Sequence, residues 1–215
     1  MKNHVKIFIF LSFFVSGCTS LKLLSPLGPG RELSQHKKPP KISIEKREQL
    51  VKLAHQAIGK SRIDLKGSRF RADCSGTIRA LFAQARIPLG GIIKNQDDND
   101  VKTIYRYVQK YGQIFKTEPL PGDLIFFHNT YNRSNSGSMN DALTHIGIIE
   151  KIDEDIIYFI HHLGRTIIRS RMNINNPKDI YDSKRNQRIN HILRRADNKH
   201  KSYTAGELFA GFGRL

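Results

Sequence analysis

The chain has 215 residues, of which 39% are hydrophobic, so it is long enough for one domain with its own core and a short additional segment. It contains two cysteines, which excludes a disulfide-rich scaffold, and its apolar runs are too short for a membrane-spanning helix. The net charge of +17 favours an anionic partner but does not choose among nucleic acid, anionic lipid and anionic wall polymer, and a basic solvated surface explains it equally well.

Residues 1–17 have the pattern of a secretory leader. Two lysines give a positive start, residues 7–15 form an apolar run of the usual length, and small residues precede Cys18. Small residues before a cysteine resemble the bacterial lipobox, in which the cysteine is lipidated and becomes the first mature residue. We therefore expect a lipoprotein signal peptide over residues 1–17, with a plain signal peptide or a buried apolar strand as the alternatives.

Lipidation of Cys18 implies a membrane anchor and leaves Cys74 as a free thiol. Thr19 follows the lipidated residue, at the position where Asp resembles a signal for retention in the inner membrane. The expected location is therefore the cell envelope, on the periplasmic face of the outer membrane if the bacterium has two membranes. Residues 18–41 are rich in Pro and Gly, which indicates a membrane-proximal linker without regular structure.

Helices are expected in the first half of the domain, which begins near Ile42. Apolar side chains recur at helical spacing in residues 45–58, 73–86 and 101–111. Residues 60–72 are polar and basic and are expected to form a loop. Asp73 suits the N-cap of the second helix, so Cys74 is expected in the first turn of that helix.

Short apolar strands follow the helices. They are predicted at residues 124–127, 145–152, 156–162, 166–170 and 189–194. A hairpin turn at residues 153–155 joins two of them. Helices followed by an antiparallel sheet indicate an α+β domain over residues 42–196. Residues 197–215 match no pattern, and we expect a C-terminal extension that packs on the domain or binds a partner.

Cys74 is the candidate nucleophile, because a helix N-terminus stabilises the thiolate and so lowers its pKa. Gly76 would let a substrate approach the backbone. A nucleophilic thiol needs a base, and the hairpin brings His145 near His161 and His162. The alternatives are an inert buried cysteine, hydrogen-bonded structural histidines, and zinc bound by these residues.

Four motifs resemble, in this order, those of the NlpC-type cysteine peptidases, which are papain-like endopeptidases of the cell wall. They are Asp-Cys-Ser-Gly at 73–76, Pro-Gly-Asp-Leu-Ile-Phe-Phe at 121–127, His-Ile-Gly-Ile at 145–148 and Phe-Ile-His at 159–161. The resemblance covers roughly residues 46–170. It implies a papain-like fold, with N-terminal helices packed on a small antiparallel sheet or half-barrel. The order of Cys before His is that of the ordinary family and not of its circularly permuted relatives.

The resemblance also implies roles for the candidate catalytic residues. Cys74 would be the nucleophile, His145 the base, and His161 the polar residue that orients His145. His162 is the alternative orienting residue, because a shift of one residue in strand register exchanges the two side chains. No metal and no organic cofactor is expected.

Three further residues are expected at the substrate site. The resemblance places Asp73 and Ser75 in its wall. Many family members have Tyr in a Gly-Lys-Pro-Tyr stretch ahead of the nucleophile, and here Arg62 ends the corresponding stretch at residues 59–62. This departure concerns cleavage specificity more than the chemistry of the thiol.

The expected function is that of a lipid-anchored, monomeric endopeptidase of the envelope. Its partners would be peptidoglycan stem peptides, cut between γ-D-glutamate and a diamino acid, and the membrane that holds its lipid. The alternatives are a wall amidase or another thiol hydrolase on the same fold, and a wall-binding lipoprotein without turnover. No nucleic acid is expected as a partner, because the leader directs export and no base-reading or RNA-stacking motif occurs.

Overall fold

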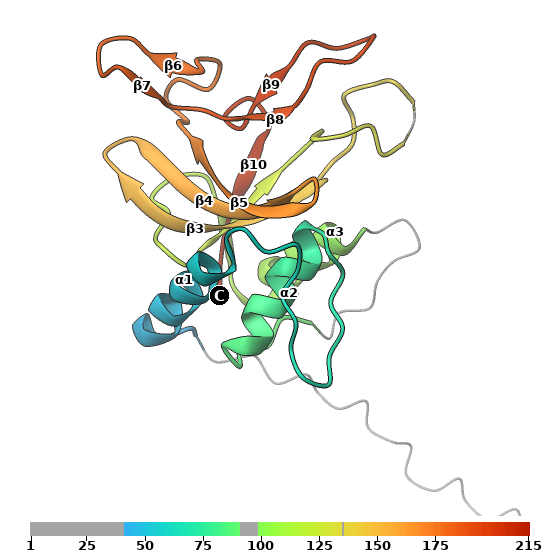
Figure 1. Ribbon diagram of the computed structural model, residues 1–215, viewed down its shortest axis with the longest axis vertical. Helices are drawn as coiled ribbons and strands as arrows, with labels where there is room; N and C mark the ends of the chain where they lie inside the picture. The colour runs from blue at the N-terminus through green and yellow to red at the C-terminus, as the bar shows by residue number, and fades with distance from the viewer. Residues whose placement is uncertain (1–40, 91–98, 135) are drawn as a thin grey trace, which may run out of the picture. The chain divides into compact units, whose positions relative to one another are not determined.

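Residues 41–90, 99–134 and 136–215 are described by the structure, a computed structural model. The expected signal peptide, Cys18 and the expected linker up to residue 40 lie outside the described residues. Every described residue belongs to one compact unit, in which helices lie against a sheet (Figure 1). The expected α+β class, with helices packed on an antiparallel sheet, is confirmed.

Three α-helices occur in the described residues, and each starts at a side chain that caps it. They are α1 (Ile44–Ala57), α2 (Cys74–Gln84) and α3 (Asp100–Tyr111). The caps Ser43, Asp73 and Asn99 each accept a hydrogen bond from a backbone N–H in the first turn. The three expected helices are confirmed, with ends within two residues of those observed.

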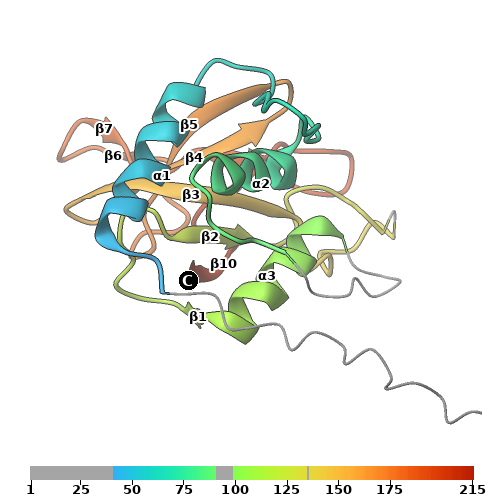
Figure 2. The ribbon, with the colours of Figure 1, turned by 90° about the horizontal axis from the view of Figure 1, so that it is seen from below.

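The second layer is a six-stranded antiparallel sheet in the described part of the chain, with strand order β1-β10-β2-β3-β4-β5 (Figure 2). Its strands are β1 (Gln113–Phe115), β2 (Leu124–Phe127), β3 (His145–Asp153), β4 (Ile156–Leu163), β5 (Thr166–Met172) and β10 (Phe209–Arg214). Strands β2 to β5 correspond to the first four expected strands, each within two residues.

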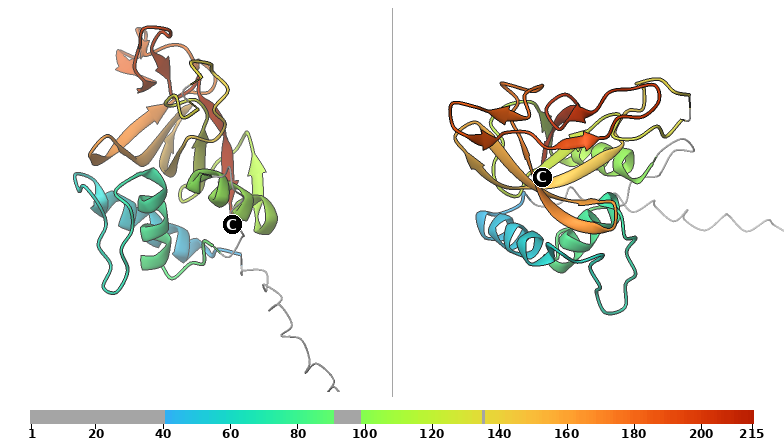
Figure 3. Two further views of the ribbon diagram at one scale, coloured as in Figure 1. Left: turned by 90° about the vertical axis from the view of Figure 1, so that its right-hand side faces the viewer. Right: turned by 45° about the horizontal axis from the view of Figure 1, so that its top comes forward.

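Two short ribbons lie outside this sheet. They pair β6 (Tyr181–Asp182) with β7 (Gln187–Arg188), and β8 (Ile192–Arg194) with β9 (Tyr203–Thr204). The expected strand at 189–194 is thus shortened to β8, and it pairs outside the large sheet. Figure 3 shows the ribbons beyond the sheet face that is turned away from the helices.

The sheet is buried on both faces, which explains its continuous apolar strands. On the helix face, one core cluster includes Leu50, Leu81, Ile104, Ile146, Ile148 and Ile160. On the opposite face, a second cluster includes Ile125, Phe127, Phe159, Leu208 and Phe212. Residues 124–127 are all buried, so β2 contributes to both cores and shows no alternation of polar and apolar residues.

The expected C-terminal extension, residues 197–215, contains a strand of the large sheet, β10, and so is in part integral to the domain. Strand β10 lies between β1 and β2 and pairs with both. Phe212 is fully buried, and Gly213 lies where an added Cβ would come within 2.8 Å of Phe126 and 3.0 Å of Val108. The glycines that this packing requires also weaken the sequence signal for a strand. The sheet therefore includes residues as far as Arg214.

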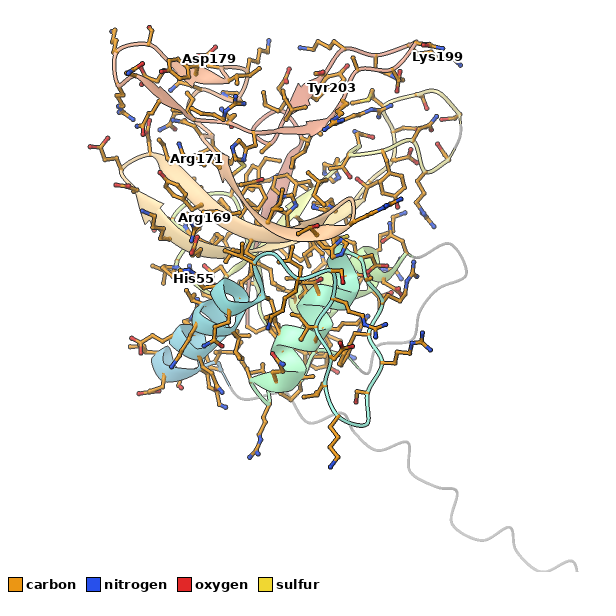
Figure 4. All side chains as sticks on the ribbon, in the orientation of Figure 1. His55, Arg169, Arg171, Asp179, Lys199 and Tyr203 are labelled. Carbon is orange, nitrogen blue, oxygen red and sulfur yellow. The ribbon has the colours of Figure 1, made fainter. Side chains whose placement is uncertain are left out.

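Helix α1 is tied to the sheet by charged groups. Glu150 on β3 is buried, accepts two hydrogen bonds from the Arg169 guanidinium on β5, and lies 3.4 Å from His55 on α1. His55 and Arg169 are labelled in Figure 4. At the other end of α1, Asp123 is fully buried and pairs with Arg47 at 2.7 Å and Arg214 at 2.6 Å. These groups fix α1 relative to β3 and β10.

Among the described residues, the helices lack the combination of length and hydropathy that crossing a bilayer requires.

Candidate active site

Cys74 begins α2, and the residue before it holds the helix start in place. Asp73 Oδ1 accepts hydrogen bonds from the Gly76 N–H and the Ser75 hydroxyl, each at 2.8 Å. Asp73 Oδ2 pairs with Arg71 Nε at 2.8 Å. Asp73 and Ser75 both line the cavity that Cys74 lines, as expected, and they also bind each other. Their first effect is therefore to fix the position of the thiol.

The Cys74 thiol is neutral in the resting protein. Burial raises its pKa to about 11, and the negative charge of Asp73 adds to that rise. The backbone N–H groups of Ile146, Ser75 and Cys74 hydrogen-bond the sulfur and lower the pKa by less. The expectation of a lowered pKa was wrong, because desolvation and a nearby carboxylate outweigh the effect of the helix start.

His145 and His161 form a hydrogen-bonded pair on the sheet face away from the helices. His145 Nε2 lies 2.7 Å from His161 Nδ1, and His161 Nε2 lies 2.9 Å from Ser170 Oγ. All three side chains are buried, and the two rings pack against Phe127 and Phe159. The geometry places His161 directly behind His145, as expected for an orienting residue.

One tautomer pattern satisfies this chain of contacts and leaves His145 able to act as a base. His145 carries its proton on Nε2 and donates it to His161 Nδ1, and His161 donates from Nε2 to the Ser170 hydroxyl oxygen. The lone pair on His145 Nδ1 is then free to accept a proton. The contact of the Cys74 sulfur with the Ile146 N–H places the thiol beside the start of β3, where His145 lies.

Both histidines are neutral near pH 7. Burial, with a smaller contribution from the charge of His162, lowers the pKa of His145 to about 4. Burial also lowers the pKa of His161 well below its usual value, with the charges of His145, His191 and His162 as further causes. These two pKa values disfavour a resting thiolate–imidazolium pair, so transfer of the thiol proton to His145 has to accompany attack of the sulfur on a substrate.

A cavity of about 400 Å³ brings the candidate residues together. Cys74, His145, Asp73 and Ser75 all line it, whereas His161 lies behind His145 and does not. The wall is completed by Arg71, Ala72, Asn99, Asp100, Val101, Thr130, Tyr131, Thr144, His162, Leu163, Gly164 and Leu193. The candidate nucleophile and base therefore share one space that a substrate can enter.

Two site residues were missed by the sequence analysis. Ser170 was missed because its role depends on the pairing of β4 with β5, which places it on the same face as His161. Tyr131 was missed because it lies in a polar loop without regular structure. Burial raises its pKa, and it lines the cavity that Cys74 lines. An aromatic residue among Asn, Ser and Gly in residues 128–141 was the available signal.

Arg62 is not brought into the Cys74 cavity. It lines a second, neighbouring cavity, and its Nε pairs with Asp64 Oδ1 at 2.8 Å. Both side chains of this pair are largely exposed. The structure therefore does not place Arg62 where the thiol chemistry would occur.

His161 and His162 point to opposite faces of β4, and this difference can be measured. His162 Nε2 lies 2.8 Å from the Ser61 carbonyl oxygen, away from the His145–Ser170 chain. Replacing His161 with alanine is expected to lower kcat roughly 10- to 100-fold, because His145 loses the acceptor that fixes its tautomer. The His162→Gln variant is the comparison, with a smaller loss of kcat expected, because His162 lines the cavity but is not hydrogen-bonded to His145. Steady-state kinetics that gave the reverse order would assign the orienting role to His162.

Gly76 is required by the fold, and the expected contact with substrate is not needed to explain it. An added Cβ would lie 2.1 Å from the Arg71 carbonyl oxygen, which is backbone and cannot move cheaply. Gly76→Ala is therefore expected to lower the free energy of unfolding by about 1–3 kcal/mol, although Ala in place of Gly usually stabilises a helix. Gly90→Ala is the control, since the nearest atom there is 3.9 Å away. Urea unfolding that shows Gly76→Ala to be stabilising would contradict this account.

The described residues contain no group of three or more His, Cys, Asp or Glu that could hold a metal ion. His145 Nε2 and His161 Nδ1 are hydrogen-bonded to each other.

Comparisons with known proteins bear on the family that the chain resembles. Residues 59–186, more than half of the chain, match the sequence model of the NlpC/P60 family. No curated protein matches the chain.

Three solved structures are similar at low identity. A lipoprotein of the NLP/P60 family from Staphylococcus aureus is 24% identical, with a TM-score of 0.37, over 62% of this chain and 38% of that one. NlpC2 from Trichomonas vaginalis is 16% identical, with a TM-score of 0.40, over 84% of this chain and 50% of NlpC2. Ly7917 is 14% identical, with a TM-score of 0.42, over 59% of this chain and 56% of Ly7917. The chain thus spans between 38% and 56% of the length of these proteins.

Proposed function

The chain belongs to the NlpC/P60 family, whose members are generally cell-wall peptidases or hydrolases, and we propose that it is a cysteine endopeptidase of the cell envelope. Its substrates in this proposal are peptidoglycan stem peptides. The observation that carries the proposal is one cavity lined by both Cys74 and His145, with His145 held from behind by His161 and Ser170.

In the proposed reaction, His145 Nδ1 takes the thiol proton as the Cys74 sulfur attacks the scissile carbonyl carbon. Backbone N–H groups at the start of α2 stabilise the oxyanion. Protonated His145 gives its proton to the leaving amine, the C–N bond breaks, and a thioester remains on Cys74. Water, deprotonated by His145, attacks the thioester, which releases the new carboxylate and restores the thiol.

The proposed scissile bond joins γ-D-glutamate to a diamino acid. It is supported by the motifs at residues 73–76 and 145–148, which resemble those of family members that cut this bond. The net charge of +17 supports an anionic substrate of this kind. A wall amidase, which would cut at the glycan–peptide junction, would use the same thiol chemistry on a different bond.

Digestion of intact peptidoglycan, followed by mass spectrometry of the fragments, tests this function. The wild-type protein is expected to release fragments with a new diamino-acid amine, and Cys74→Ala is expected to release none. A free lactyl carboxylate would instead identify an amidase. Binding to peptidoglycan without any new chain end would overturn the proposal in favour of a wall-binding protein.

We also propose that a lipid on Cys18 holds the protein to the membrane, which in a bacterium with two membranes is the outer one. The leader pattern of residues 1–17 supports this. Expression of the full chain in bacteria should give a detergent-phase protein whose first residue carries acyl chains by mass spectrometry. Recovery of Cys18→Ala in the detergent phase to the same extent as wild type would contradict the anchor.

A further inference from the structure

A second cavity adjoins the one that Cys74 lines. It has a volume of about 500 Å³ and is lined by Arg62, Arg69, Phe70, Arg71, Ala72 and Asp73. The last three of these residues also line the first cavity, so the two spaces share a wall. The second cavity therefore lies next to the space where the scissile bond of a substrate would be held.

The two cavities differ in charge. The Cys74 cavity is lined by two carboxylates and one guanidinium, those of Asp73, Asp100 and Arg71. The second cavity is lined by three guanidinium groups and one carboxylate. The second cavity is therefore the one that favours an anionic group.

The three arginines of the second cavity differ in their partners. Arg62 pairs with Asp64 at 2.8 Å. Arg71 pairs with Asp73 at 2.8 Å and with Asp100 at 3.4 Å. Arg69 has no ion pair and no side-chain hydrogen bond to any of the described residues. Among the described residues of this wall, Arg69 is thus the arginine whose guanidinium keeps all of its donors for a ligand.

We propose that this second cavity binds a carboxylate of the peptide substrate and that the Arg69 guanidinium receives it. This inference rests on the proposed function, and it names the part of the substrate that the cavity takes. A guanidinium binds a carboxylate through two parallel hydrogen bonds, which suits recognition better than a point charge does. Half-buried Phe70 gives the same cavity an apolar wall for the carbon atoms that bear the carboxylate.

The chemistry of the proposed bond provides such a carboxylate close to the thiol. A γ-linked glutamate uses its side-chain carboxyl in the scissile bond, so its α-carboxylate stays free on the acyl side. The diamino acid supplies a second free carboxylate, on the leaving side. Both are the same chemical group, and either can be tested by replacing it with an amide.

Calorimetric binding to the Cys74→Ala protein tests this inference without turnover. The ligands are a tripeptide containing γ-D-glutamate and a diamino acid, and two derivatives in which one or the other carboxylate is an amide. Adding Arg69→Gln is expected to weaken binding of the parent peptide about tenfold, the effect of losing one charge-assisted pair near the surface. Arg69→Lys should lose part of that affinity, because it keeps the charge but not the planar fork.

The expected pattern identifies which carboxylate is bound. One amide should bind about tenfold more weakly than the parent, and Arg69→Gln should not weaken that amide further. Lys66→Gln is the matched control, since Lys66 is exposed on the same loop and lines neither cavity. Equal binding by Arg69→Gln and its parent, an equal loss in Lys66→Gln, or no binding of any peptide would overturn the inference. The proposed function is judged separately, by hydrolysis with Cys74 intact.

Discussion

Replacing His145 with glutamine is expected to lower kcat for stem-peptide hydrolysis by roughly three orders of magnitude, with little change in KM. Glutamine can still donate a hydrogen bond toward His161, so the buried contact at Nε2 is kept in part, while the group that would take the thiol proton is lost. His55→Gln is the control, because His55 lies on α1 outside both cavities. Hydrolysis by His145→Gln within tenfold of the wild-type rate would contradict a role for His145 as the base.

The pH dependence of the same reaction follows from the pKa of His145. The imidazole must be neutral to act, and burial lowers its pKa to about 4. The ratio kcat/KM should therefore be nearly constant from about pH 5 to neutrality and should fall as the pH drops through about 4. An acid limb near pH 6.5 would mean that His145 keeps its usual pKa in the free enzyme.

The free energy of unfolding is expected to fall by about 3 kcal/mol between pH 7 and pH 4 through His145 alone. Its pKa is about 4 in the folded protein and about 6.5 in the unfolded chain, so the unfolded state binds more protons in this window. The stability that it contributes is complete above pH 6.5 and is lost as the pH falls toward 4. His161, whose pKa burial also lowers, adds to the loss in the same direction.

Urea unfolding of wild type and His145→Gln at pH 7 and pH 4 measures this contribution. The wild-type protein should lose more stability between the two pH values than the variant does, by about 3 kcal/mol. Carboxylates do not account for that difference. Asp155 and Glu207, whose pKa values are lowered in the folded protein, are present in both proteins, so we expect their contributions to cancel in the comparison. If wild type and His145→Gln lost the same free energy of unfolding between pH 7 and pH 4, protonation of His145 would not destabilise the folded protein.

The helices and strands that follow from a local sequence pattern were predicted well. Helices α1, α2 and α3 follow from caps at Ser43, Asp73 and Asn99 and from apolar residues at helical spacing. Strands β2 to β5 follow from apolar runs and short turns. Strand β10 could not be predicted in the same way, because its neighbours β1 and β2 lie more than 80 residues earlier and its glycines fit their packing.

The sequence predicted those residues of the candidate site that stand in a short recognisable motif. Cys74, His145 and His161 were identified by motif, and the structure brings Cys74 and His145 to one cavity with His161 behind His145. The direction of the Cys74 pKa was wrong, since burial and the charge of Asp73 depend on the folded environment. The partner of a buried imidazole, Ser170, likewise depends on strand register.

The neutral state of the thiol decides how its reactivity should be tested. With its pKa raised to about 11, Cys74 is almost entirely protonated near neutral pH, so slow alkylation of the free protein is expected even if it is the nucleophile. Proton transfer to His145 accompanies attack on the bound substrate. A test that traps the reaction itself is therefore more informative than a thiol label.

Mass spectrometry of the protein quenched in acid during turnover of a stem peptide is that test. A covalent adduct equal in mass to the acyl half of the substrate is expected, and digestion should place it on the peptide that contains Cys74. The Cys74→Ala variant should show neither adduct nor turnover. Turnover by Cys74→Ala, or an adduct on another residue of the wild-type protein, would contradict the assignment of Cys74 as the nucleophile.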